Sequence, residues 1–127
     1  MAGVIRLDTH VVVWLYTGEV DHLSETARRA IETETLVVSP IVQLELTFLH
    51  EINRLTVSGA EIIGDLQQRL ALQLSDQSLA SIVHAAASLQ WTRDPFDRLL
   101  VADAFAANSR LLTKDAKIRE HVSIAFW

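Results

Sequence analysis

The chain has 127 residues, of which 50% are hydrophobic, and its formal net charge is −5. These values predict a single folded domain, residues 1–127, and exclude a disordered chain. The absence of cysteine excludes a disulfide scaffold, a thiol nucleophile and a Cys-ligated metal centre. The acidic balance argues against a broad basic surface for nucleic acid, but it permits an enzyme that holds phosphates through metal ions. Because neither a signal peptide nor a membrane-spanning stretch is evident, we expect a cytoplasmic protein.

Short apolar runs alternate with helical patterns along the chain. Predicted strands cover residues 4–8, 36–39, 70–74, 110–113 and 123–127. Helix-start signals, an N-cap residue often followed by proline, stand at Ser24, Ser39-Pro40, Ser58 and Asp94-Pro95. A further helix is expected over residues 76–88, and the helix after Pro40 is expected to reach about residue 54. The alternation predicts an α/β fold, a three-layer α/β/α sandwich around a mostly parallel sheet of roughly five strands.

Acidic residues follow two of the predicted strands. Asp8 ends the first strand, and Asp115 follows the fourth. Ligands of parallel sheets gather beyond the carboxyl ends of the strands, so both positions are candidates for a functional site. Each acid alone is equally well explained as the N-cap of the next helix.

Glu45 occupies an unusual position in the helix that follows Pro40. Apolar residues recur there at helical spacing, and we expect them to face the core: Ile41, Leu44, Phe48, Ile52 and Leu55. Glu45 lies among them, well away from the polar face that contains Gln43. Burial of an unpaired carboxylate is costly, so Glu45 should have a partner, a raised pKa or a metal ion. The alternative is a helix rotated far enough for Glu45 to reach water.

Asp97 is the second candidate on a helix. An acid in the first turn is explained by the helix dipole or by capping. Its neighbours three and four residues on, Leu100 and Val101, nevertheless indicate an inward face. Asp94 is interpreted as the helix cap, and Asp103 as a surface or rim acid.

The four acids Asp8, Glu45, Asp97 and Asp115 each come after a strand or early in a helix. In a parallel sheet they would converge at one edge, where ionised carboxylates repel each other unless cations compensate them. Ligation by oxygen alone suits Mg²⁺ or Mn²⁺ and does not suit zinc. Such ions activate water and stabilise the charge that develops on a phosphodiester.

Four motifs carry a resemblance to a known family. They are Leu7-Asp8-Thr9-His10-Val11, the helix from Ser39 that contains Glu45, the run Arg93-Asp94-Pro95-Phe96-Asp97-Arg98-Leu99-Leu100-Val101-Ala102, and Leu111-Leu112-Thr113-Lys114-Asp115. In this order and at this chain length, the sequence resembles the PIN-domain nucleases, and more closely the VapC-type toxins of toxin–antitoxin pairs. The resemblance covers nearly the whole chain.

The resemblance implies an endoribonuclease that depends on Mg²⁺ or Mn²⁺ and cleaves single-stranded RNA. The residues that match the family's acidic quartet, and would hold metal, are Asp8, Glu45, Asp97 and Asp115. The polar residues that match its supporting positions are Thr9, Ser39 and Thr113. We match Asp97 and not Asp94 to the third acid, because the run after Asp97 fits the family's following helix. A cognate VapB-type antitoxin and a homodimer are the implied partners.

Three basic residues lie close in sequence to the acids and are candidates for holding RNA phosphates: Arg93, Arg98 and Lys114. For any one of them, solvated surface charge or internal pairing is the competing explanation. We interpret Trp14 and Trp91 as core or dimer contacts in preference to base-stacking platforms. His10 is the one histidine beside a motif, and metal activation of water leaves it little need to act as a general base.

Two other functions remain open from the sequence. One is a catalytically silent PIN-fold module whose acids only cap helices and whose surface binds a protein. The other is a stand-alone PIN-like nuclease of RNA maturation or DNA. The RNA target, the number of metal ions and the dimer face are not specified by the sequence.

Overall fold

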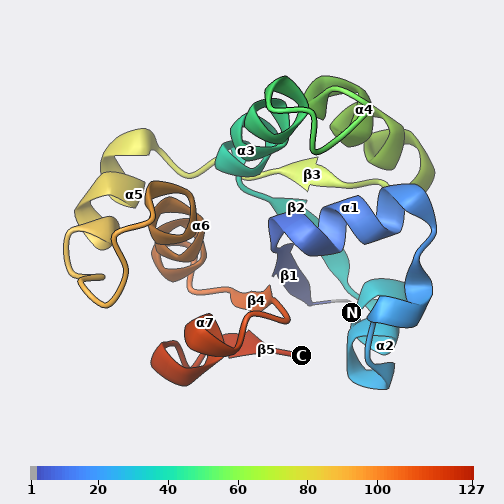
Figure 1. Ribbon diagram of the computed structural model, residues 1–127. Helices are drawn as coiled ribbons and strands as arrows, with labels where there is room; N and C mark the ends of the chain where they lie inside the picture. Colours follow the sequence, from blue (N-terminus) through green and yellow to red (C-terminus); the bar gives the residue numbers. More distant parts are fainter. Residues whose placement is uncertain (1–2) are drawn as a thin grey trace.

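A computed structural model describes residues 3–127 (Figure 1). Its central sheet contains β1 (Val4–Leu7), β2 (Thr35–Val38), β3 (Gln73–Leu74), β4 (Arg110–Leu112) and β5 (Ala125–Phe126). The strand order is β3-β2-β1-β4-β5, and every neighbouring pair is parallel. The predicted parallel α/β sheet is therefore confirmed, and β1 lies at its centre.

Helices cover both faces of this sheet. They are α1 (Thr9–Thr17), η1 (Val20–His22), α2 (Glu25–Thr33), α3 (Pro40–Glu51), α4 (Gly59–Leu70), α5 (Leu79–Ala86), α6 (Pro95–Ala106) and α7 (Ala116–His121). Figure 1 shows α5 and α6 together on one side of the strands, with α1 and α4 on the other. This arrangement gives the three layers that the alternating pattern predicts. Among residues 3–127, no helix is both long enough and apolar enough to cross a membrane.

The helix starts agree with the capping signals of the sequence. The side chains of Ser24, Ser58 and Asp94 accept hydrogen bonds from backbone N–H groups in the first turns of α2, α4 and α6. The predicted helix over 76–88 begins later, at Leu79, because Ser78 is the residue that caps it. Helix α3 ends at Glu51 and does not reach residue 54, since Asn53 adopts a left-handed conformation with φ of 62°.

The core face expected for α3 is wrong at three of its five positions, because only Ile41 and Leu55 pack partly against the core. Leu44, Phe48 and Ile52 are 56%, 44% and 45% exposed, whereas Val42 and Leu46 are fully buried. Both sides of this helix are apolar, so hydrophobic periodicity did not discriminate between them. The packing of α4 decides the orientation: a Cβ on Gly59 would lie 2.7 Å from the Gln43 carbonyl oxygen, so only glycine permits this approach.

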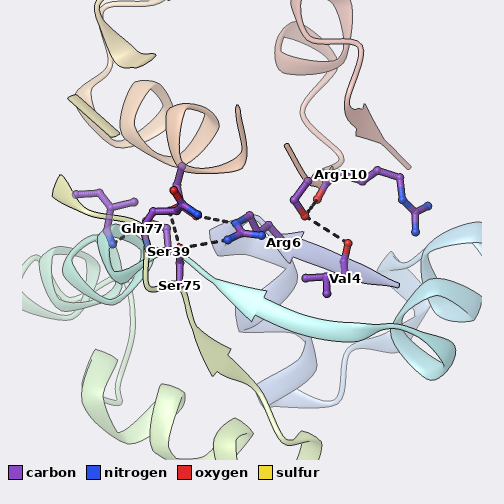
Figure 2. A network of polar contacts seen from close by, with 9 residues as sticks. Val4, Arg6, Ser39, Ser75, Gln77 and Arg110 are labelled. Atoms are coloured by element: carbon purple, nitrogen blue, oxygen red, sulfur yellow. Dashed lines mark hydrogen bonds and ion pairs between the residues drawn. The ribbon is translucent and has the colours of Figure 1, made fainter. Parts of the chain in front are cut away.

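A buried polar network crosses the layers below the carboxyl edge of the sheet (Figure 2). The Arg6 Nε of β1 donates to Asp103 Oδ2 of α6 at 2.9 Å, and the Ser75 Oγ donates to Asp103 Oδ1 at 2.7 Å. A third bond, from Arg6 to the Ser75 Oγ at 3.2 Å, closes the triangle. Asp103 is completely buried, so its interpretation as a surface or rim acid is wrong. A buried carboxylate requires a charged partner, and Arg6 provides it.

Candidate active site

The carboxyl ends of β1 and β4 lie side by side and place Asp8 next to Thr113. Leu7 pairs with Leu112, and the Asp8 N–H donates to the Leu112 carbonyl oxygen at 3.1 Å. Thr113 follows β4, and its N–H donates to the Phe126 carbonyl oxygen of β5 at 3.1 Å. Backbone pairing thus fixes the first residue beyond each strand.

Asp8 is almost completely buried between two donors. Its Oδ1 accepts from the Thr9 N–H at 2.6 Å, and its Oδ2 accepts from the Thr113 hydroxyl at 2.5 Å. Burial raises the pKa of Asp8 above its ordinary value, while the bonds from Thr113 and Thr9 act in the opposite direction. Asp8 caps α1 as expected, and its second oxygen belongs to a site shared with β4.

Glu45 joins this site from α3. Its Oε1 accepts from the Thr9 hydroxyl at 2.5 Å, which links α3 to the start of α1. Burial is the main cause that raises the pKa of Glu45, and the negative charges of Asp8 and Asp94 add to it. Glu45 is half-buried at the border between the buried and exposed sides of α3. The hydrogen-bonding partner and the raised pKa that we expected for Glu45 are present. The apolar residues from which we inferred them, Leu44 and Phe48, are nevertheless exposed and do not face the core.

Asp94 and Asp97 at the start of α6 have different environments. The Asp94 Oδ1 accepts from the N–H groups of Phe96 and Asp97, at 2.9 and 3.1 Å, so this side chain is the helix cap. Asp97 is half-buried, and its pKa is raised to about 7. Burial is the largest cause, followed by four neighbouring carboxylates: Asp94, Asp8, Asp115 and Glu45. The charges of all the predicted site acids therefore act on Asp97.

Asp115 lies on the exposed side of the same region. Its Oδ1 accepts from the Ile118 N–H at 3.1 Å and caps α7. The Asp115 N–H donates to the Thr113 hydroxyl oxygen at 3.1 Å. The same hydroxyl donates to Asp8, so Thr113 connects the two acids.

The acids form a common negative region and not a closed ligand shell. Within residues 3–127, no three Asp, Glu or His side chains converge closely enough to constitute a metal-binding cluster. Oxygen atoms of Asp8 and Glu45 accept from threonine hydroxyls, and an Asp115 oxygen accepts from a helix N–H. The available donors are carboxylate and hydroxyl oxygens, which suit hard divalent cations.

The remaining predicted site residues lie in mixed positions. The Ser39 hydroxyl is buried and accepts from the Ile41 N–H at the start of α3. Arg98 donates to the carbonyl oxygens of Ala86 and Ala87 at the end of α5, at 2.8 and 3.4 Å. Arg93 and Lys114 are exposed. Of the three predicted phosphate-binding residues, two are therefore available at the surface and Arg98 is bound to α5.

Comparison with known proteins gives the family. The model of the PIN domain matches residues 5–122, and the chain therefore belongs to the PIN-domain family. It is 33% identical over 120 residues to Ribonuclease VapC22 of Mycobacterium tuberculosis, covering 92% of this chain and 91% of that protein. The resemblance to the VapC-type ribonucleases that the four motifs carry is confirmed by this relative. The prediction of one domain over residues 1–127 stays a prediction.

Two solved structures have the same fold at lower sequence identity. VapBC2 from Rickettsia felis, bound to a DNA fragment from its promoter, aligns with a TM-score of 0.65 and 18% identity over 92% of each chain. A toxin–antitoxin complex from Klebsiella pneumoniae aligns with a TM-score of 0.66 and 16% identity, over 97% of this chain and 96% of the other. These likenesses concern the fold and confirm the layered architecture.

Proposed function

We propose that the chain is the toxin of a VapBC-type pair, a metal-dependent endoribonuclease that cleaves single-stranded RNA in the cytoplasm. One observation carries the proposal: carboxylates from the end of β1, from α3, from the start of α6 and from the β4–α7 connection gather around Asp97, and together with burial they raise its pKa to about 7. Such a concentration of like charge is unfavourable without a cation. The VapC-type relative supports the assignment of the reaction to RNA.

The donor set fits Mg²⁺ or Mn²⁺. We assign Asp8, Glu45 and Asp97 as the residues that would hold the ion, with Asp115 completing the site directly or through water. All four supply oxygen, which is the ligand that these ions prefer. When bound, the ion would supply charge compensation for the transition state and would favour ionisation of the attacking water.

The chain's own residues prepare the site for this ion. Thr113 and Thr9 donate to Asp8 and Glu45, which orients both carboxylates and opposes the rise in pKa that burial causes. Lys114 and Arg93 are exposed cations beside the acids, and we assign them to the RNA phosphates. Arg98 donates to two carbonyl oxygens at the end of α5, and these bonds compete with a contact to a phosphate.

The proposed protein partners are a VapB-type antitoxin and a second copy of the chain. The solved structures with this fold include toxin–antitoxin complexes, which supports the antitoxin. The homodimer is supported by the exposed apolar stripe Leu44, Phe48 and Ile52 on α3, because large apolar side chains gathered on one surface commonly mark a protein contact. Light scattering on the isolated chain measures its mass in solution and so tests the homodimer directly.

The proposed function is tested by incubating the purified chain with a mixed pool of RNA, with single-stranded DNA in parallel, and mapping the new ends. We expect RNA cleavage with Mg²⁺ or Mn²⁺, none with EDTA, and none by Asp8→Asn, whose circular dichroism should remain that of the wild type. Asp65→Asn is the matched control, since this acid on α4 pairs with Arg69 at the surface, away from the site, and its loss should leave cleavage unchanged. Full activity of Asp8→Asn, or of the wild type in EDTA, contradicts the proposal. Cleavage of DNA alone favours a stand-alone PIN-like nuclease. Cleavage of neither polymer favours a catalytically silent PIN-fold module that binds a protein.

A further inference from the structure

An aromatic row extends along α1 from the acidic site. His10 is exposed and stands two residues after Asp8. Trp14 lies one helical turn further, with its ring centroid 6.0 Å from that of His10. His22 of η1 is also exposed and stacks on Trp14, with the ring centroids 4.9 Å apart and the planes inclined by 16°. The row therefore begins beside a site acid and ends at the surface.

Two further residues complete this cluster from the other end of the chain. The Lys114 Nζ lies 5.8 Å from the Trp14 ring centroid, and Lys114 immediately precedes Asp115. The Trp127 ring is tilted by 60° to that of Trp14, with the centroids 6.0 Å apart. We call these five residues the Trp14 cluster: His10, Trp14, His22, Lys114 and Trp127. It joins flat rings to a cation next to the acids.

Packing alone does not account for the composition of the Trp14 cluster. Trp14 and Trp127 pack partly against the core, which agrees with the interpretation of Trp14 from the sequence. A purely structural tryptophan, however, would be surrounded by apolar side chains, whereas the neighbours of this ring include two exposed histidines and an exposed lysine. His10 and Trp14 are four residues apart in α1, which places both on one face of the helix.

We propose that the Trp14 cluster is a subsite for the base and phosphate of a nucleotide next to the scissile phosphodiester. The proposal rests on the proposed function. Bases of single-stranded RNA are unpaired and stack on aromatic side chains whatever their identity. Lys114 would contact the phosphate of the same nucleotide, which matters for a chain whose net charge of −5 otherwise repels RNA.

A direct binding measurement tests the stacking contact without requiring cleavage. A short single-stranded RNA that spans a mapped cleavage site is titrated into the full chain in EDTA, and its Kd is measured by fluorescence anisotropy. We expect Trp14→Leu to weaken binding about tenfold, while Trp14→Phe, which keeps a flat ring, retains most of the affinity. Phe105→Leu is the matched control, because this 42% exposed aromatic lies at the far end of α6 from Asp97.

A second experiment removes a base from the RNA and leaves the protein side chain in place. Oligonucleotides that each carry one abasic position are compared between the wild type and Trp14→Leu. At one position beside the scissile bond, removal of the base should weaken binding to the wild type but not to the variant, because the contact is already lost. Lys114→Gln should lower the slope of log Kd against log salt, whereas Arg29→Gln on α2 should not.

The outcomes separate this subsite from the proposed function. Equal RNA affinity of the wild type and Trp14→Leu overturns the subsite, including the case in which Trp14→Leu weakens only antitoxin binding. Equal losses of RNA affinity in Trp14→Leu and Trp14→Phe also overturn it. The subsite is likewise overturned if, at every position, removal of the base weakens binding to Trp14→Leu as much as binding to the wild type. Failure of the wild type to cleave any RNA contradicts the proposed function. In that case the Kd values of the wild type, Trp14→Leu and Trp14→Phe are measured with an arbitrary single-stranded RNA, and their comparison still tests the subsite.

Discussion

Asp97 is the site acid that four other carboxylates influence, in addition to its burial. Its ordinary pKa is 3.8, and burial with the neighbouring carboxylates raises it to about 7. Between these two values the folded chain holds a proton that the unfolded chain has released. Stability of the metal-free protein is therefore highest at low pH within this window, and it falls as the pH rises through the folded pKa.

We predict that Asp97→Asn weakens this pH dependence. In EDTA, the wild type should lose thermal stability between about pH 5 and about pH 8, and the variant should lose less, because the amide carries no charge at either pH. The variant should melt a few degrees higher than the wild type at the upper pH. Addition of Mn²⁺ should raise the melting temperature of the wild type more than that of the variant. Differential scanning fluorimetry measures the melting temperature of both proteins at the two pH values, in EDTA and with Mn²⁺. Identical pH profiles of the two proteins would show that Asp97 does not cause the loss of stability.

At the residue scale, some environments were predictable and others were not. Asp8 and Thr113 follow strands, and the position of a strand end in the sequence is enough to place both at the carboxyl edge. Asp103 was misplaced because its partner Arg6 is 97 residues away and no local pattern connects them. The Trp14 cluster likewise depends on Lys114 and Trp127, which only the folded sheet brings to α1.

The Arg6–Asp103 pair joins two elements that position the acids, since β1 leads into Asp8 and α6 begins near Asp97. Loss of one partner leaves an uncompensated buried charge. We predict that Asp103→Leu destabilises the chain by about 3–5 kcal/mol. The double variant Arg6→Met with Asp103→Leu should be more stable than Asp103→Leu alone, because it removes both charges.

Urea unfolding followed by circular dichroism measures these free energies. Arg69→Met serves as the control, because solvent screens the exposed Arg69–Asp65 pair on α4 and its loss should change the free energy of unfolding little. A double variant that is no more stable than Asp103→Leu would show that the cost does not come from the unpaired Arg6.

The contact between α3 and α4 gives a matched pair of glycine variants. Gly59 is buried against α3, where a Cβ would lie 2.7 Å from the Gln43 carbonyl oxygen and 3.0 Å from the Thr47 nitrogen. We predict that Gly59→Ala destabilises the chain by about 1–3 kcal/mol, since backbone atoms would have to move. A Cβ on Gly64, further along α4, meets nothing within 4 Å, so Gly64→Ala should stabilise the helix by about 0.5–1 kcal/mol. Thermal unfolding compares the two, and equal shifts in the same direction would contradict this account.

At the element scale, helix starts were easier to predict than helix faces. Caps such as Ser39 followed by Pro40 act locally, so the sequence alone specifies them. The exposed and buried sides of α3 are both apolar, and the choice between them depends on the docking of α4. The partnered environment of Glu45 and its raised pKa were predictable, because any orientation of a helix with two apolar sides leaves this carboxylate beside apolar groups.

At the scale of the whole molecule, an acidic chain with a net charge of −5 is proposed to act on a polyanion. The proposed divalent ions would resolve this conflict, because they would invert the local charge at the carboxyl edge and leave the rest of the surface acidic. The sheet order β3-β2-β1-β4-β5 makes this possible, since it places the central strands β1 and β4 next to each other and their acids at one edge.

Calorimetric titration of Mn²⁺ into the purified chain tests this account most directly. We predict saturable binding by the wild type, strong weakening in Asp8→Asn and Asp97→Asn, and unchanged binding in Asp65→Asn. Absence of binding at millimolar Mn²⁺, or equal binding by the wild type and Asp8→Asn, would contradict the claim that these distant carboxylates form one metal site.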